Sequence, residues 1–151
     1  MQTLTMLGVL GLAYLVGSIP IGFIMVKVSV GKDIREIESG RIGGTNAMRA
    51  AGNLVGYVTT LLDILKGAST VWIAKTIFPE NAWMHILAPV LGIIGHNYSI
   101  YLIRKDERGN LCIGGGAGGT PTLGGATGLW WPNILILIPI GLLIFYGVGY
   151  A

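Results

Sequence analysis

Long apolar stretches alternate with shorter polar ones along the chain. Four stretches are apolar over about the length that a helix needs to cross a bilayer, roughly 20 residues: residues 4–28, 54–78, 83–103 and 129–150. We therefore predict four transmembrane helices. The first is interrupted at Gly17-Ser18-Ile19-Pro20, where the proline removes a backbone donor and bends the helix. We expect this break to lie against other helices or a cavity, where the freed carbonyls find partners.

The composition supports a membrane protein. Of the 151 residues, 52% are hydrophobic and 11% are charged, against roughly 25% charged in an average soluble domain. So few charges cannot cover a water-facing surface, and such high hydrophobicity excludes a disordered chain. We predict an all-α, polytopic integral membrane protein, with residues 1–151 forming a single membrane domain.

The polar segments 31–53 and 104–128 hold most of the lysines and arginines, whereas the segment 79–82 carries mainly Glu80. The positive-inside rule places the two basic segments in the cytoplasm and the N-terminus outside. Both are rich in glycine, and we expect re-entrant loops. The net charge of +3 fits these loops, and because no basic run is interleaved with aromatic residues, nucleic acid is not an expected partner.

The first polar segment has the composition of a phosphate-binding loop. Its centre reads Ser39-Gly40-Arg41-Ile42-Gly43-Gly44-Thr45-Asn46, and Arg49 follows. Glycines let backbone N–H groups approach an anion, the hydroxyl and amide side chains add neutral donors, and the two arginines can grip phosphate oxygens in a bidentate manner. The alternative is a flexible loop whose arginines only satisfy the positive-inside rule.

The second polar segment contains another glycine loop, Gly114-Gly115-Gly116-Ala117-Gly118-Gly119-Thr120. It can offer backbone donors to an anion, or it can simply permit a tight turn between helices. The pairs Gly52 and Gly56, and Gly124 and Gly128, have the four-residue spacing that favours close packing of helices.

Three ionisable residues fall inside the apolar stretches. Asp63 and Lys66 lie three residues apart on one face of a predicted helix. Charges inside a membrane are costly, and they often mark a functional site. They can instead neutralise each other and join helices. His96 follows Gly95 and precedes Asn97-Tyr98-Ser99, which can supply polar partners to a site histidine or to a packing histidine.

Together these segments resemble the acyl-phosphate-dependent glycerol-3-phosphate acyltransferases of bacterial inner membranes, the PlsY type. The resemblance covers most of the chain in the family's order. It is carried by the proline break, by the run from Gly31 through Arg49, and by two shorter segments, Leu62-Asp63-Ile64-Leu65-Lys66-Gly67 and Gly95-His96-Asn97-Tyr98-Ser99.

The resemblance implies transfer of a fatty acyl group from acyl phosphate to the 1-hydroxyl of glycerol 3-phosphate, giving lysophosphatidate at the cytoplasmic face. It implies no acyl-CoA and no acyl carrier protein, and we expect no cofactor and no metal. The expected partners are the two substrates and the lipid bilayer. The residues expected to be catalytic are Ser39, Asn46, Arg49, Lys66 and His96. The residues expected to bind substrate phosphate are Gly40, Arg41, Gly43, Gly44, Thr45, Gly115, Gly116, Gly118, Gly119 and Thr120.

The chain departs from the family's pattern in three places. Arg41 and Gly44 stand where the family usually has Asn and Ala, and the lysines of the family's second motif are missing from the second glycine loop, which follows an inserted charged stretch, 104–110. Family members also run longer and carry a third motif. We therefore expect this chain to be the N-terminal portion of a longer acyltransferase domain.

Two other function classes remain open on the sequence. Broken helices, charges at mid-membrane depth and glycine loops also occur in transporters of anionic metabolites. An inactive fragment or paralogue that only packs against other helices is the other alternative.

Overall fold

The structure, a computed structural model, describes residues 1–106 and 108–148, and these are mostly helical. The helices are α1 (Gln2–Ser18), α2 (Ile21–Val30), α3 (Gly44–Ala51), α4 (Asn53–Ile77), α5 (Ala82–Asn97), α6 (Gly119–Leu129) and α7 (Asn133–Val148). Two 3₁₀ turns, η1 (Ile34–Glu36) and η2 (Ile100–Leu102), and two short antiparallel strands, β1 (Ile103–Lys105) and β2 (Leu111–Ile113), complete these elements.

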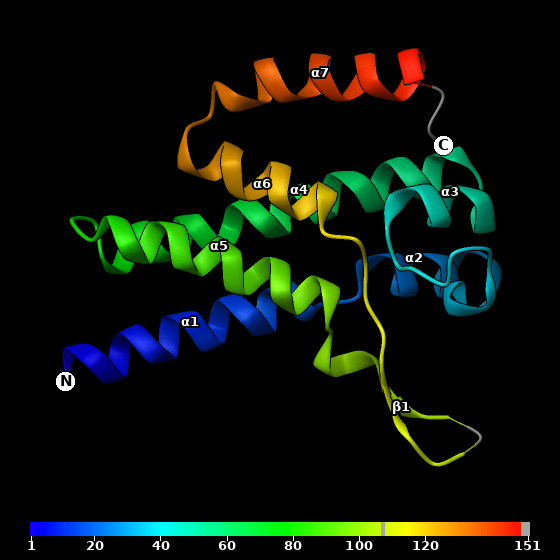
Figure 1. Cartoon of the computed structure of the whole chain (residues 1–151), viewed down its shortest axis with the longest axis horizontal. Coiled ribbons are helices and arrows are strands. Elements are labelled where there is room, and N and C mark those ends of the chain that lie inside the picture. Colours follow the sequence, from blue (N-terminus) through cyan, green and yellow to red (C-terminus); the bar gives the residue numbers. More distant parts are fainter. Residues whose placement is uncertain (107, 149–151) are drawn as a thin grey trace.

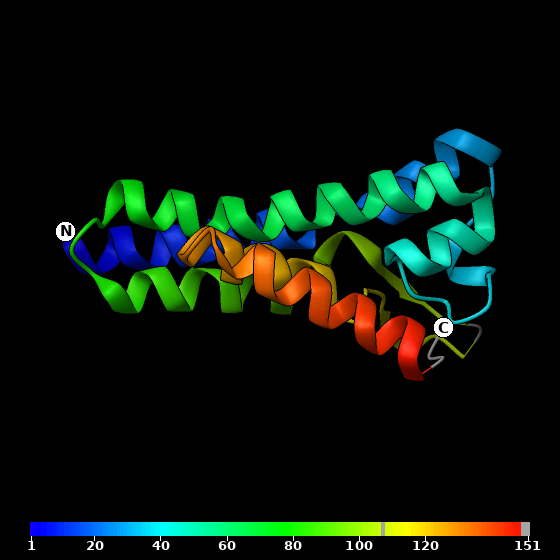
Figure 2. The same ribbon diagram turned by 90° about the horizontal axis from the view of Figure 1, so that it is seen from above.

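The long helices α1, α4 and α5 run alongside one another, and α6 packs on α4 (Figures 1 and 2). The N-terminus lies at one end of this bundle. At the opposite end, α2, α3 and the β1–β2 hairpin gather (Figure 1). The segments that carry the two glycine loops therefore meet at one end of the molecule, as the charge pattern of the sequence predicts.

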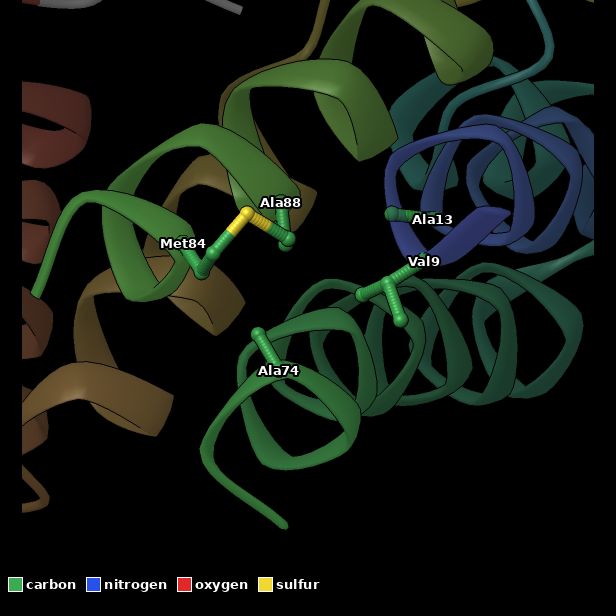
Figure 3. Packing of buried hydrophobic residues seen from close by; sticks show 5 residues of the cluster. All are labelled: Val9, Ala13, Ala74, Met84 and Ala88. Atoms are coloured by element: carbon green, nitrogen blue, oxygen red, sulfur yellow. The ribbon is translucent and has the colours of Figure 1, made fainter. Parts of the chain in front are cut away.

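Mostly small side chains fill the contact between the long helices. Val9 and Ala13 of α1, Ala74 of α4, and Met84 and Ala88 of α5 form one buried cluster (Figure 3). Large apolar side chains point outward instead. Examples on four different helices are Leu4, Tyr57, Trp72, Leu87 and Leu135. This arrangement, with small residues between the helices and large apolar residues on the outside, is expected when the surrounding solvent is lipid.

The structure bears out the first two predicted spans. Within residues 1–106 and 108–148, two helical segments are long and apolar enough to cross a membrane: Gln2–Val30, with a mean hydropathy of 2.2, and Asn53–Ile77, with a mean hydropathy of 1.2. They coincide with the predicted stretches 4–28 and 54–78. The α5 and α7 helices, at 16 residues each, are shorter than the predicted third and fourth spans.

The break in the first span is where the sequence places it. The α1 helix ends at Ser18, and α2 begins at Ile21, after Pro20. The carbonyl of Ile19 accepts a hydrogen bond from Lys66 Nζ at 2.8 Å, and the carbonyl of Ser18 accepts one from the hydroxyl of Ser99. The break is therefore packed against α4 and the end of α5, as expected for exposed carbonyls in an apolar medium.

Three boundaries differ from the prediction. The α5 helix stops at Asn97 rather than at residue 103, because Ser99 turns its amide to the carbonyl of Gly114. Residues 103–105 and 111–113 pair as a hairpin in a chain predicted to be all-α. The segment 119–129 is a helix rather than part of a loop, and Leu129 ends that helix instead of beginning the next one.

Glycines explain the unexpected helix α6. A Cβ added to Gly124 would lie 2.0 Å from the carbonyl oxygen of Ile64, and one added to Gly67 would lie 2.2 Å from that of Pro121. The backbones of α4 and α6 therefore touch, which glycine alone permits. Glycine disfavours an isolated helix by about 1 kcal/mol relative to alanine, and close packing offsets this cost here. The expected packing role of the Gly124 and Gly128 pair is confirmed, since both face α4.

Candidate active site

The two glycine loops meet around one pocket of about 210 Å³. The first loop contributes the segment from Ser39 to Asn46, the second contributes Ala117 to Thr120, and His96 at the end of α5 completes the wall. The lining residues are Ser39, Arg41, Gly43, Gly44, Thr45, Asn46, His96, Ala117, Gly118, Gly119 and Thr120. Segments that are far apart in the sequence thus form a single site.

Two helices begin at this pocket. The α3 helix starts at Gly44 after the N-cap Gly43, and α6 starts at Gly119 after the N-cap Gly118; neither N-cap has a side chain that could bond the first amides. The first N–H groups of a helix have no partner within the helix, and the helix dipole makes this end favourable for anions. Two such ends on one pocket make it a candidate anion site, and no lysine is among its lining residues in the described part of the chain.

The amide of Asn46 holds the first loop in shape. Its Nδ2 donates to the carbonyls of Ile34, Ile37 and Arg41 at 3.1, 3.0 and 2.8 Å. Because the amide group has two hydrogens, these three bonds share them. Asn46 is 3% exposed and occupies the centre of the loop. Its side chain fixes the backbone that lines the pocket.

The backbones of the two loops touch directly. The amide of Ile42 donates to the carbonyl of Gly115 at 3.4 Å, and the amide of Gly116 donates to the carbonyl of His96 at 2.9 Å. A Cβ on Gly116 would lie 1.9 Å from Nε2 of His96. A side chain at position 116 would therefore displace the imidazole, so glycine there lets the second loop pass over the histidine.

His96 is part of a buried polar cluster with two residues of α4. Lys66 Nζ lies 3.1 Å from His96 Nδ1 and 3.0 Å from Asp63 Oδ1, and it also donates to the carbonyl of Ile19. A lysine ammonium can only donate, so Nδ1 of His96 accepts and its proton resides on Nε2. The side chain of Lys66 is 4% exposed and that of Asp63 is fully buried.

The cluster bears on both interpretations of the intramembrane charges. Asp63 and Lys66 do pair with each other and do join α4 to the α1 break and to α5. Lys66 does not line the pocket; it lies behind His96, which does. It contacts the site through the imidazole rather than through open space.

The other expected residues divide between two places. Gly40, Gly115 and Gly116 line a neighbouring pocket, which also includes Arg41. Arg49 is exposed and belongs to the last turn of α3, and neither pocket includes it. Its expected catalytic role stays a prediction.

Sequence analysis missed Arg35, Asn97 and Arg104, all of which line the neighbouring pocket. Arg35 and Arg104 were visible as basic residues of the two polar segments. Nothing in their spacing showed that a hairpin would bring residue 104 back to the first loop.

Comparison with known proteins shows the family of this chain. The family model described as glycerol-3-phosphate acyltransferase matches residues 7–151. The chain belongs to this family. A glycerol-3-phosphate acyltransferase of Bartonella henselae is 33% identical over 142 residues, which cover 93% of this chain and 63% of the relative. One from Pelagibacter ubique is 42% identical over 97 residues, covering 64% of this chain and 49% of the relative.

Two crystal structures of a family member have the same fold. The structure of PlsY (YgiH), an integral membrane glycerol 3-phosphate acyltransferase, in its glycerol 3-phosphate form matches with a TM-score of 0.81 and 30% identity, covering 94% of this chain and 66% of that chain. The lysophosphatidic acid form matches with a TM-score of 0.73 and 26% identity. The chain spans about half to two thirds of the length of these relatives.

Proposed function

We propose that the chain transfers an acyl group from acyl phosphate to the 1-hydroxyl of glycerol 3-phosphate, forming lysophosphatidate. The observation that carries this proposal is the pocket on which the uncapped N-termini of α3 and α6 converge beside His96. Both substrates bear phosphate, and this pocket has the donors that phosphate requires. The family to which the chain belongs supplies the reaction class.

The chemistry needs few groups from the protein. The 1-hydroxyl oxygen attacks the carbonyl carbon of acyl phosphate, a new C–O ester bond forms, and the C–O bond to phosphate breaks. The phosphate leaves with the bonding electrons and takes up the hydroxyl proton, so that hydrogen phosphate is released. Because phosphate is already a good leaving group, catalysis rests on positioning and on stabilising charge. No covalent acyl-enzyme is required.

Each part of the pocket has a role in this scheme. The first amides of α3 and α6 hold phosphate oxygens, and the hydroxyls of Thr45 and Thr120 add donors. His96, with its proton on Nε2, donates to developing negative charge rather than removing a proton. Lys66 is a positioning residue that fixes the histidine tautomer. Asn46 keeps the first loop in its binding conformation.

We also propose how the chain is placed in the membrane. The chain is an integral membrane protein of about four spans, with both loops and the pocket at the cytoplasmic face of a bacterial inner membrane and the N-terminus outside. Its apolar outer surface and its two long apolar segments support this placement, and so does the excess of basic residues in the two loop segments.

A matched pair of histidine variants tests the proposal. His96→Ala and His85→Ala are compared in membranes supplied with acyl phosphate and labelled glycerol 3-phosphate. His85 lies near the other end of the bundle, where its Nε2 contacts the carbonyl of Phe78. We expect labelled lysophosphatidate from the wild-type chain and from His85→Ala. His96→Ala should lose activity by about 100-fold or more, the usual cost of removing one donor to developing charge.

Membrane insertion and thermal unfolding of both variants show whether His96→Ala is still folded. Absence of labelled product from an inserted, folded wild-type chain would refute acyl transfer by this chain. Full activity in folded His96→Ala would remove the histidine from the site.

A further inference from the structure

A second pocket, of about 410 Å³, adjoins the first one where the two loops touch. Both pockets include Arg41, whose neighbour Ile42 makes the backbone contact with Gly115. The residues that line the second pocket are Arg35, Gly40, Arg41, Asn97, Tyr98, Arg104, Ile113, Gly114, Gly115 and Gly116. It is a larger space than the first pocket, and arginine side chains and glycine backbone form much of its wall.

Three arginines from three separate segments converge on this space. Arg35 belongs to η1, Arg41 to the first loop and Arg104 to β1. No Asp or Glu is among its lining residues within the described part of the chain. Asp33 lies beside it and pairs with Arg35 through both carboxylate oxygens, at 2.6 to 3.1 Å. One of the three charges is thus balanced, and two remain for a ligand.

Contacts with Asp33 and Phe23 fix the side chain of Arg35, whereas Arg41 and Arg104 can contact a ligand. The Cζ of Arg35 lies 5.0 Å from the centre of the Phe23 ring. The bonds from Arg35 lower the pKa of Asp33 to about 2, and the positive charge of Arg104 contributes to this shift. Arg104 is therefore near enough to act together with Arg35. Neither Arg41 nor Arg104 forms an ion pair with another described residue.

The β1–β2 hairpin contributes Arg104 from its first strand and Ile113 from its second to the wall of this pocket. Arg104 lines the pocket and Lys105 does not. Arginines gathered without acids are typical of sites for phosphate, which they bind in a bidentate manner.

We infer that the second pocket binds a second phosphate group through Arg41 and Arg104, with Arg35 as a fixed part of its wall. The inference rests on the proposed function, because acyl transfer brings together two substrates that each carry a phosphate. The two phosphates repel each other and need separate sites. The helix N-termini hold one of them in the first pocket, and the arginines hold the other. This phosphate belongs either to glycerol 3-phosphate or to the headgroup of an anionic phospholipid.

Two arginine variants of the full chain test the second pocket. Arg104→Gln removes a lining charge. Arg108→Gln removes the same charge from the same hairpin at a residue that does not line the pocket. Each protein is placed in phosphatidylcholine nanodiscs, and its Kd for glycerol 3-phosphate is measured by calorimetry. We expect Arg104→Gln to raise the Kd by about tenfold or more, the worth of one charge-assisted hydrogen bond, and Arg108→Gln to leave it within about twofold.

A second arm tests the lipid source. The same proteins are placed in nanodiscs that contain phosphatidylglycerol, without glycerol 3-phosphate, and the tightly retained anionic lipid is counted by native mass spectrometry. If a headgroup fills the pocket, Arg104→Gln loses that lipid and Arg108→Gln keeps it. A loss specific to Arg104 in either arm supports the site and identifies the source. Equal behaviour of the two variants in both arms overturns it.

The acyl-transfer assay on the wild-type chain separates this inference from the proposed function. Phosphate binding that depends on Arg104 without any acyl transfer would leave the second site standing and remove the reaction. Acyl transfer by a chain whose phosphate binding is unchanged in Arg104→Gln would support the reaction and remove the second site. Both arginines are exposed, so neither substitution should affect folding, and equal thermal unfolding of the two variants is the check.

Discussion

At the scale of single residues, the buried cluster of Asp63, Lys66 and His96 lies against the candidate site, and His96 forms part of the pocket wall. Lys66 Nζ donates to the carbonyl of Ile19, lies 3.1 Å from His96 Nδ1 and forms an ion pair with Asp63 Oδ1 at 3.0 Å. The lysine thereby connects the break in the first span to the histidine of the pocket. Positioning a neutral imidazole with its proton on Nε2 requires this donor, because a water or a hydroxyl at Nδ1 could either donate or accept.

This arrangement predicts that the lysine has separable effects on stability and activity. Lys66→Met leaves the buried carboxylate of Asp63 without its partner, and breaking a buried pair in this way costs about 3–5 kcal/mol. The double variant Asp63→Asn/Lys66→Met leaves no buried charge and should regain most of that stability. Acyl transfer should stay low in both, because neither fixes the tautomer of His96.

Thermal unfolding in detergent and the acyl-transfer assay, on all three proteins, check this prediction. Recovery of both stability and activity in the double variant would mean that Lys66 serves only to neutralise Asp63. Recovery of stability alone would identify it as a positioning residue.

The sequence revealed part of this cluster. The three-residue spacing puts Asp63 and Lys66 on one face of a helix and left open whether they mark a functional site or neutralise each other, and the structure shows that they pair. That His96, 30 positions later, completes the cluster could not be derived, because it depends on how α5 packs against α4. Arg49 shows the opposite case, since its type fits phosphate binding but it lines neither pocket.

At the scale of elements, helix α6 links the packing of the bundle to the pocket. Its N-terminus forms part of the wall, and its glycines bring its backbone against α4. A change in the α4–α6 contact should therefore shift the start of α6 and alter the pocket, even though Gly124 itself does not line it.

A glycine pair tests this link. In Gly124→Ala the new Cβ would lie 2.0 Å from the carbonyl oxygen of Ile64, whereas in Gly11→Ala it would meet nothing within 4 Å. We expect Gly124→Ala to destabilise the fold by about 1–3 kcal/mol, as overpacking does, and to weaken binding of glycerol 3-phosphate by moving the start of α6. Gly11→Ala should leave both unchanged.

Thermal unfolding and calorimetric binding measure the two effects. Wild-type stability in Gly124→Ala would show that the helices can separate without cost. Lowered stability with unchanged affinity would separate the packing of α6 from its N-terminus.

Elements with long apolar patterns were predictable, and those made of glycine were not. The spans 4–28 and 54–78 coincide with helices because burial in lipid favours any apolar stretch of that length. The α6 helix was mistaken for a loop because its four glycines and three threonines argue against a helix, and only the contact with α4 reverses that preference. The hairpin was missed because its three-residue strands are too short to show alternation.

At the scale of the whole molecule, the arrangement of the loops bears on the choice between enzyme and transporter. The first glycine loop and the hairpin lie toward the end of the bundle opposite the N-terminus, and the second glycine loop runs from the hairpin to the start of α6 (Figure 1). A transporter places its site near the middle of the membrane, between parts that open alternately to either side. The charges at mid-bundle depth here, Asp63 and Lys66, are bonded to each other and to His96.

This architecture predicts chemistry without transport. In sealed proteoliposomes loaded with labelled glycerol 3-phosphate, we expect no release of label beyond that of protein-free vesicles, because the charges inside the bundle are paired with each other rather than arranged along a path. When acyl phosphate and glycerol 3-phosphate are both added outside, lysophosphatidate should form on the outward-facing molecules alone, and His96→Ala should abolish it. Release of unmodified label that depends on the protein and is lost in His96→Ala would instead assign the site to transport, since the same donors would then bind phosphate on its way through the membrane.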